Sequence, residues 1–171
     1  MKLVFATHNP NKVKEIQTKV GNKHEILSLS DIGFKNEIPE DYDTLRENAH
    51  TKANTVFKET GLNCFADDTG LEVDALGGAP RVYSARYAGE PSDSNANIDK
   101  LLSALIYKKD RTAQFRTIIC LIIDGQCFYF EGVAKGSITM ERNGLDGFGY
   151  DPVFLPAGYN ETFAQMPLRS Q

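Results

Sequence analysis

Hydrogen-bond donors gather in one short segment near the start of the sequence. Six consecutive residues supply hydroxyl, amide and ammonium groups: Thr7, His8, Asn9, Pro10, Asn11 and Lys12. An apolar run precedes them and helical spacing follows them, so we expect them between a strand and a helix. Unpaired N–H groups and the positive end of the helix dipole suit phosphate oxygens at such a place. The segment therefore predicts a phosphate-binding turn, and the alternative is an ordinary Asx turn that caps a helix.

Two adjacent carboxylates form a second candidate group. Asp67 and Asp68 come directly after Cys64–Ala66, which we expect to form a short strand. The carboxyl end of a strand is the edge where α/β folds bind ligands. Because successive strand residues point to opposite faces, we expect one carboxylate to face the site and the other to hydrogen-bond nearby backbone. Carboxylates suit Mg²⁺ that is shared with substrate phosphates, and the alternative is an Asp-Asp-Thr-Gly turn.

A lysine interrupts the apolar stripe of a predicted helix. Thr44 and Glu47 have the spacing of a capping box, and Gly61 is typical of a helix end. Lys52 falls within the apolar stripe of this helix, and Asn48 lies on the same side. Lysine often extends its stem along apolar surface to reach water, which is the alternative to a role in a binding site.

Aromatic residues and glycines alternate in segment 146–152, Asp-Gly-Phe-Gly-Tyr-Asp-Pro. Glycine lets a backbone approach a ligand closely, and an aromatic ring can stack on a purine. We therefore predict a nucleoside contact, and the alternative is a structural loop whose rings fill the core. The sequence has no P-loop, Rossmann or nucleophile-elbow glycine pattern. Combined with the donor turn, the lysine and the paired carboxylates, the segment favours a magnesium nucleotide as ligand.

Apolar periodicity predicts the elements that position these residues. Helical spacing of apolar residues indicates helices after the donor turn, with Val13, Ile16 and Val20 on one face and an end at Gly21, then from Thr44 to Gly61, and over 98–106 with Ser92 or Ser94 as the cap. The dipeptide Asp124-Gly125 indicates a hairpin, and a loop follows from residue 144. Without repeats or linkers, the sequence predicts a single α/β domain over residues 1–171. We expect strands at 2–7, 24–29, 64–66, 71–76, 113–123 and 127–134.

Composition excludes several classes of protein. The 171 residues carry 19 Lys and Arg against 23 Asp and Glu, a formal charge of −4 without a basic run, so a nucleic-acid partner is not expected. No apolar stretch approaches the roughly 18 residues of a membrane span, and the first residues do not form a signal peptide. The three cysteines are well separated, without a Cys-x-x-Cys motif, and the three histidines lack ligand spacing. We therefore expect reduced thiols in a cytoplasmic protein rather than disulfides or a zinc site.

In order along nearly the whole chain, these motifs resemble those of the inosine triphosphate pyrophosphatase-like enzymes, which hydrolyse non-standard purine nucleoside triphosphates. The segment from Thr7 to Lys12 is similar to the Thr-x-Asn-x-x-Lys element of this family. The most specific block is 66–80, Ala-Asp-Asp-Thr-Gly-Leu-Glu-Val-Asp-Ala-Leu-Gly-Gly-Ala-Pro. Further similar blocks are 38–40, 47–53, 83–87, 146–154 and 162–164.

The resemblance implies that the protein converts inosine, deoxyinosine and xanthosine triphosphates to the monophosphate and pyrophosphate, which removes them from the nucleotide pool. It also implies an elongated mixed β-sheet flanked by helices, a central active-site cleft, Mg²⁺ as cofactor and a homodimer. The donor turn and Lys52 would bind the substrate, with Thr7, Asn9, Lys12 and Lys52 on the polyphosphate. Glu40 and Asp68 would bind Mg²⁺, and Asp68 would activate the attacking water. The remaining substrate contacts would be Thr69, Phe148, Gly149, Tyr150 and Asp151.

Two segments depart from the family pattern. Arg81 stands where the family has glycine, and a glycine there indicates a positive φ. The family continues beyond the position of Met166 to a Ser-His-Arg element that contacts the base, which Arg169 and Ser170 do not supply. The resemblance therefore implies a shortened C-terminal end. Two alternatives are a Maf-type nucleotide pyrophosphatase and a truncated nucleotide-binding protein with little turnover.

Overall fold

The computed structural model describes residues 1–145 and 147–166. Its helices and strands are β1 (Lys2–Phe5), α1 (Pro10–Val20), β2 (Glu25–Leu27), α2 (Leu45–Thr60), β3 (Cys64–Val73), β4 (Pro80–Arg81), α3 (Ser94–Ala104), β5 (Thr112–Ile123), β6 (Gln126–Ile138) and β7 (Phe154–Pro156). The strand order is β2-β1-β3-β5-β6-β7, with β4 beside β3. Because β1 pairs in parallel with β2 and β3 whereas β3–β4 and β6–β7 are antiparallel, the sheet is mixed. The predicted α/β class with a mixed sheet flanked by helices is confirmed.

The chain divides into two compact units. The first unit comprises residues 1–68 and 117–131, and the second comprises 69–116 and 132–171. Strands β3, β5 and β6 each contribute residues to both units. The single domain and the central cleft expected from the sequence stay predictions. No helix in the described part of the chain is long and apolar enough to cross a membrane.

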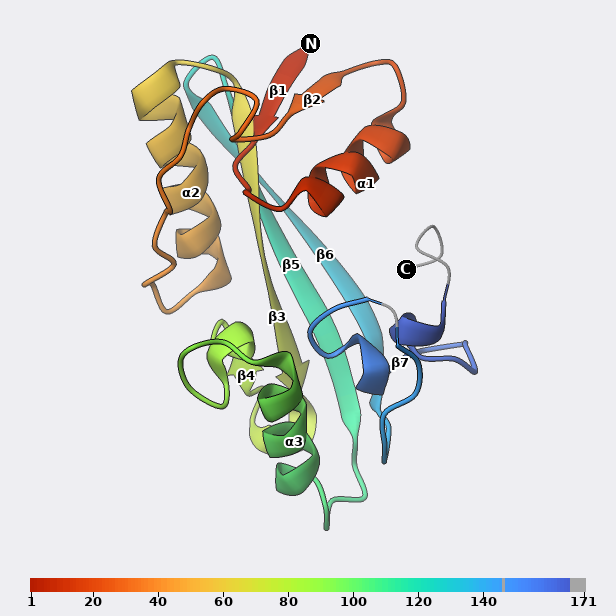
Figure 1. Ribbon diagram of the computed structural model, residues 1–171. Helices are drawn as coiled ribbons and strands as arrows, with labels where there is room; N and C mark the ends of the chain where they lie inside the picture. The colour runs from red at the N-terminus through yellow and green to blue at the C-terminus, as the bar shows by residue number, and fades with distance from the viewer. Residues whose placement is uncertain (146, 167–171) are drawn as a thin grey trace. The chain divides into compact units, whose positions relative to one another are not determined.

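In the first unit, successive strand residues pack against different helices. Ala66 of β3 belongs to a buried cluster with Ala53 of α2. The neighbouring Phe65 stacks on Phe5 of β1 with 4.4 Å between ring centroids, and this pair packs against Ile16 of α1. Figure 1 accordingly shows α1 and α2 on opposite sides of β1 and β3. The period-two alternation of the strands therefore places one helix on each face of this sheet.

Both helices of the first unit begin with side-chain caps, of which the sequence predicted Thr44, whereas a cap in the donor turn was only the alternative considered there. The side chain of Asn9 accepts a hydrogen bond from the backbone N–H of Asn11 at 3.0 Å. The hydroxyl of Thr44 accepts one from the N–H of Glu47 at 3.1 Å. Gly61 ends α2 with a φ of +70°, a left-handed conformation that glycine adopts readily. These caps fix the register at which α1 presents Lys12 and α2 presents its polar residues.

The second unit has its own core. Ile98 and Leu101 of α3 are buried with Leu71 of β3, Phe154 of β7 and Val153. The third helix is therefore confirmed, although its cap is neither Ser92 nor Ser94. The carboxylate of Asp93 caps it and accepts from the N–H groups of Asn95 and Ala96 at 3.0 and 3.2 Å.

The course of β3 differs from the prediction. A short strand at 64–66 and a separate extended segment at 71–76 were expected, with an Asp-Asp-Thr-Gly turn between them as one alternative, whereas one strand of ten residues ends at Val73 and a 3₁₀ helix follows. Pairing with β1 at Phe65 and with β4 at Leu71 holds the intervening residues extended despite their low strand preference. Asp67 and Asp68 consequently lie inside β3, at the level where the neighbouring strand β1 ends.

Two further differences lie where periodicity is weak. Strand β7 occupies part of the region after residue 144 that was predicted to be a loop. Ile106, expected on the apolar face of the third helix, is 63% exposed beyond the helix end. The predicted hairpin is confirmed, since Asp124 and Gly125 both have a positive φ between β5 and β6.

Candidate active site

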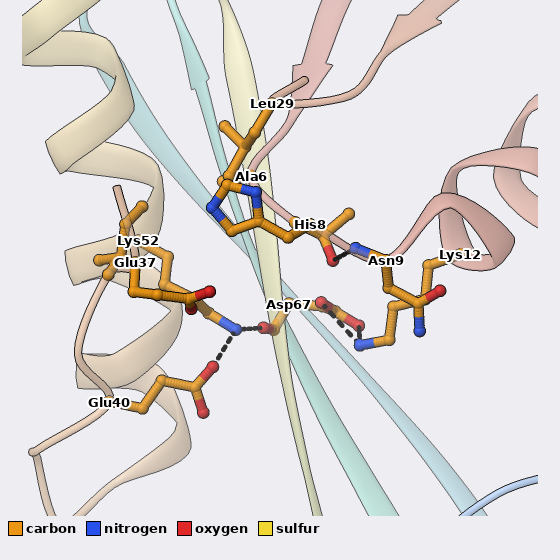
Figure 2. A pocket seen from close by; sticks show the side chains of 11 residues that line it. Ala6, His8, Asn9, Lys12, Leu29, Glu37, Glu40, Lys52 and Asp67 are labelled. Atoms are coloured by element: carbon orange, nitrogen blue, oxygen red, sulfur yellow. Dashed lines mark hydrogen bonds and ion pairs between the residues drawn. The ribbon is translucent and has the colours of Figure 1, made fainter. Parts of the chain in front are cut away.

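A pocket of about 260 Å³ opens in the first unit where β1 meets α1 (Figure 2). It brings together the donor turn, Lys52 of α2 and the loop before α2, segments that are far apart in the sequence. The pocket is lined by Ala6, Thr7, His8, Asn9, Lys12, Leu29, Glu37, Ile38, Glu40, Lys52 and Asp67.

The donor turn is held by its own side chains and by one distant carbonyl group. The backbone N–H of Asn9 donates to the hydroxyl of Thr7 at 3.1 Å. His8 Nε2 donates to the carbonyl oxygen of Asn36 at 2.9 Å, which requires the ring proton on Nε2. Pro10 and Asn11 are exposed in the first turn of α1 and do not line the pocket. The first turn of α1 contains no acidic residue, so its positive dipole end is not opposed by a carboxylate of that turn.

Two lysines approach β3 from its two sides. Lys52 Nζ lies 2.9 Å from Glu40 Oε1 and 2.5 Å from the carbonyl oxygen of Asp67 (Figure 2). Only 12% of the Lys52 side chain is exposed, so the lysine does not extend to water. Lys12 Nζ lies 3.3 Å from the nearer carboxylate oxygen of Asp67. Both ammonium groups are therefore ordered within one pocket.

The two neighbouring carboxylates have different surroundings, as the strand alternation predicts. The Asp67 carboxylate pairs with Lys12, not with the backbone groups that were expected. The Asp68 carboxylate is 9% exposed and accepts a hydrogen bond from Asn48 Nδ2 at 3.2 Å. Burial and then the nearby Glu40 raise the pKa of Asp68 to about 6, against the lowering effects of Lys52 and Asn48. A carboxylate with a pKa near neutrality is suited to accept a proton from water.

Asn48 connects this carboxylate to the loop that carries Glu40. Its side chain is 1% exposed. Asn48 Nδ2 also donates to the carbonyl of Tyr42 at 3.3 Å, and its Oδ1 accepts from the N–H of Tyr42 at 3.0 Å. Asn48 and Lys52 are one helical turn apart, so α2 presents both to the site from one face.

The charges of the pocket fit a divalent cation. Its lining contains two ammonium groups, Lys12 and Lys52, against the three carboxylates of Glu37, Glu40 and Asp67. Glu40 also raises the pKa of Asp68, which is buried and does not itself line the pocket, so these two carboxylates repel each other. Among the described residues no three His, Cys, Asp or Glu side chains form a metal cluster. Two carboxylates suffice for Mg²⁺, which keeps several water ligands. The donor set therefore fits the ion that the sequence predicted.

The remaining predicted residues belong to the second unit. Thr69 is exposed, and Phe148 is 67% exposed. Tyr150 is buried, and its hydroxyl donates to the carbonyl of Ser84 at 2.7 Å. Burial raises the pKa of Tyr150. Its ring therefore fills the core of this unit, as in the structural alternative considered for the loop.

The carboxylate of Asp151 holds the loop that contains Phe148 and Tyr150. Asp151 is buried, and its carboxylate accepts from the N–H of Phe148 at 3.0 Å. A Cβ at Gly147 would lie 2.4 Å from Asp151 Oδ2, so the close approach requires glycine. Gly149 has a φ of +59°. Asp146, the first residue of the predicted loop, lies outside the described residues, as do Arg169 and Ser170.

Residue 81 has the positive φ that a glycine at this position of the family indicates, although arginine tolerates it poorly. Arg81 has a φ of +52°, and its guanidinium group donates to the carbonyl of Gly77. Its backbone also lies against Gly70, where a Cβ would be 2.5 Å from the Arg81 carbonyl oxygen.

Three residues of the site have contacts or positions that the sequence did not predict. Asp67 was not expected to hold two lysines, and Asn48 was noted only for its side of the helix. Glu37, three residues before Glu40, also lines the pocket, although only Glu40 of this loop was expected to bind the metal. The one available signal was Asn48, a polar residue beside Lys52 within an apolar stripe.

Comparisons with known proteins agree along the whole chain. The family model described as Ham1 family matches residues 3–171. A dITP/XTP pyrophosphatase of Flavobacterium johnsoniae is 52% identical over 168 residues, which are 98% of this chain and 88% of the relative. The solved structure of a HAM1 protein from Coxiella burnetii is 34% identical with a TM-score of 0.91, covering 99% of this chain and 89% of that one. The solved structure of the Staphylococcus aureus Ham1 protein is 36% identical with a TM-score of 0.88, covering 98% of this chain and 87% of that one. The chain therefore belongs to the Ham1 family.

Proposed function

We propose that this protein hydrolyses the non-standard purine nucleoside triphosphates ITP, dITP and XTP to the monophosphate and pyrophosphate. The pairing of Lys12 and Lys52 with acidic groups in one pocket carries this proposal, because such a pocket suits a polyphosphate bound with a divalent cation. The relative of F. johnsoniae is named for activity on dITP and XTP. The reaction removes these compounds from the nucleotide pool.

In the proposed mechanism, the donor turn and the two lysines bind the phosphates. Thr7, Asn9 and Lys12 contact phosphate oxygens at the start of α1, with Pro10 and Asn11 shaping the turn and His8 tying it to the loop at Asn36. Lys52 reaches the phosphates from α2 after separating from Glu40. Because binding replaces one ion pair by another, each ammonium group keeps a charged partner throughout.

Asp68 is the proposed general base and, with Glu40, the proposed ligand of Mg²⁺. The Asn48 side chain orients the carboxylate, which accepts the proton of the attacking water. When bound, Mg²⁺ neutralises the charge that grows on the leaving pyrophosphate. In the second unit, Thr69, Phe148, Gly149, Tyr150 and Asp151 are the proposed contacts to the rest of the substrate.

A substrate panel tests the reaction. We expect inosine and xanthosine triphosphates to be hydrolysed with Mg²⁺, with pyrophosphate as the product by phosphorus NMR, and ATP and UTP to react far more slowly. Asp68→Asn is expected to lose activity, whereas the matched control Asp99→Asn, at a 69% exposed side chain, is expected to keep it. Orthophosphate release or equal rates on ATP would contradict the proposal. Nucleotide binding without any release would favour a nucleotide-binding protein with little turnover.

We also propose dependence on Mg²⁺, a homodimer and a cytoplasmic location. The acidic balance of the pocket supports the metal dependence, and the buried free thiols of Cys64 and Cys120 are typical of a reducing compartment. Chelation by EDTA is expected to abolish hydrolysis, and added Mg²⁺ to restore it. Light scattering after size exclusion should give twice the 19.0 kDa mass of the chain. A monomeric mass would contradict the homodimer, and full activity in EDTA would contradict the dependence on Mg²⁺.

A further inference from the structure

One residue of β3 contacts both lysines of the pocket. Asp67 holds Lys12 through its carboxylate, with oxygen-to-nitrogen distances of 3.3 and 3.5 Å. It holds Lys52 through its main-chain carbonyl at 2.5 Å. In Figure 2 the two ammonium groups approach Asp67 from its two sides. The Asp67 side chain is only 18% exposed, so these contacts are sheltered from bulk water.

The geometry of the sheet explains why the Asp67 carbonyl is available. The carbonyl of Phe65 accepts from the N–H of Ala6, so carbonyls of this parity point toward β1. Strand β1 ends at Phe5, and its pairing with β3 ends at the same level. The next carbonyl on that side is therefore Asp67, which has no ladder partner in β1. The ammonium group of Lys52 takes this position in place of a strand N–H.

We propose, resting on the proposed function, that Asp67 is a positioning residue for phosphate binding, whose carboxylate aligns Lys12 and whose carbonyl aligns Lys52. Lysine has a flexible stem, and fixing its ammonium group before the substrate arrives lowers the ordering cost in the transition state. The Asp67 carboxylate also repels phosphate oxygens and must release Lys12 when they bind. Asp67 therefore weakens ground-state binding while it favours turnover.

The variant Asp67→Asn separates these two effects. It removes the negative charge and keeps the shape and the main-chain carbonyl, so Lys52 stays in place. We expect the KM for inosine triphosphate to fall about threefold to tenfold and kcat to fall about tenfold. Calorimetry in EDTA should show tighter binding of inosine triphosphate than to the wild type. Asp67→Glu restores the charge and should move both constants back toward the wild type.

A double-mutant cycle tests whether Asp67 acts through Lys12. In a Lys12→Ala background, Asp67→Asn is expected to leave kcat unchanged, because its target is gone. Asp99→Asn, which removes an exposed ion-paired carboxylate of the second unit, is the control and should change neither constant. An equal further loss of kcat in the Lys12→Ala background would overturn the inference.

The outcomes separate this inference from the proposed function. If the wild type hydrolyses inosine triphosphate and Asp67→Asn changes only the free energy of unfolding, Asp67 is structural and the inference is wrong. If Asp67→Asn does not fold, Asp67→Glu and Asp67→Ser supply the same comparison of kcat with KM. If the wild type neither binds nor hydrolyses the nucleotide, the proposed function fails and the inference fails with it.

Discussion

Two adjacent aspartates of one strand carry different chemistry because their surroundings differ. Asp67 has an ammonium partner at 3.3 Å, whereas Asp68 is buried against an amide and near a second carboxylate. The different surroundings of the two carboxylates follow from the period of a strand, which the sequence predicted, whereas the backbone partner expected for one of them is not found. The lysine and amide partners were not predictable, since they join residues 55 and 20 positions apart.

Asp68 gives a pH prediction at this scale. Its pKa is raised to about 6 in the folded protein, from 3.8 in an unfolded chain. Between about pH 4 and 6 the folded protein therefore binds a proton that the unfolded chain releases. The free energy of unfolding of the metal-free protein should consequently decrease as pH rises through this window. Urea titrations at several pH values in EDTA measure this free energy. An increase with pH that Asp68→Asn abolishes would contradict the raised pKa of Asp68.

Asp68→Asn removes this effect and the base together. We expect turnover to fall by two or more orders of magnitude. At pH 7 the metal-free variant should be more stable than the wild type by on the order of 1–3 kcal/mol, because no buried carboxylate must ionise. The fold should be unchanged by circular dichroism. Near-normal turnover would exclude Asp68 as the base.

At Arg81 the backbone is strained. A φ of +52° costs an L residue roughly 1–2 kcal/mol, and the guanidinium contact to Gly77 offsets part of it. We expect Arg81→Gly to raise the melting temperature by about 2–4 °C. The matched variant Arg81→Ala keeps the backbone strain and loses the contact to Gly77, so it should lower the melting temperature. A lower melting temperature for Arg81→Gly would mean that the contact to Gly77 contributes more than the strain costs.

At the scale of elements, regular periodicity made α1, α2 and the β5–β6 hairpin predictable. The caps Asn9 and Thr44 are local signals and need no tertiary information. Strand β7 has no periodicity, and β3 crosses residues with low strand preference because its neighbours supply the hydrogen bonds. Ser92 and Ser94 were the predicted caps of α3, and the local geometry selects Asp93 between them instead.

The close approach of β3 to β4 should not tolerate a side chain at residue 70. A Cβ at Gly70 would lie 2.5 Å from the Arg81 carbonyl oxygen, and backbone cannot move aside cheaply. We expect Gly70→Ala to lower the free energy of unfolding by about 1–3 kcal/mol. Gly132→Ala in β6 is the control, because a Cβ there has no neighbour within 4 Å. Equal urea midpoints for the two variants would contradict the close approach.

At the scale of the whole chain, the order of motifs identified the family, which no single motif could do. The donor turn, the lysine helix and the aspartate pair were each compatible with an ordinary structural role. Their occurrence together, in the family's order along 171 residues, was not compatible with separate structural roles. Physical reasoning alone gave a magnesium nucleotide as ligand, and the choice of purine and the reaction came from the resemblance.

The three cysteines differ in burial, so their reactivity tests the packing of the whole chain. Burial raises the pKa of Cys64 to about 12 and that of Cys120 to about 11, so thiolate is scarce in the native protein. Cys127 is exposed. We expect iodoacetamide to modify Cys127 alone under native conditions and all three thiols in urea, as measured by peptide mass spectrometry. Cys127→Ser should abolish native labelling, and modification of Cys64 without denaturant would contradict this packing.

The excess of carboxylates in the pocket also determines which anions can interfere with the protein. With three carboxylates beside two paired lysines, a simple anion finds no free positive charge among these groups and brings no cation to offset the repulsion. Phosphate buffer and sulfate precipitants should therefore compete poorly for the pocket, visible as weak inhibition at millimolar concentration. The acidic side chains thus favour an anion that arrives together with its counter-ion.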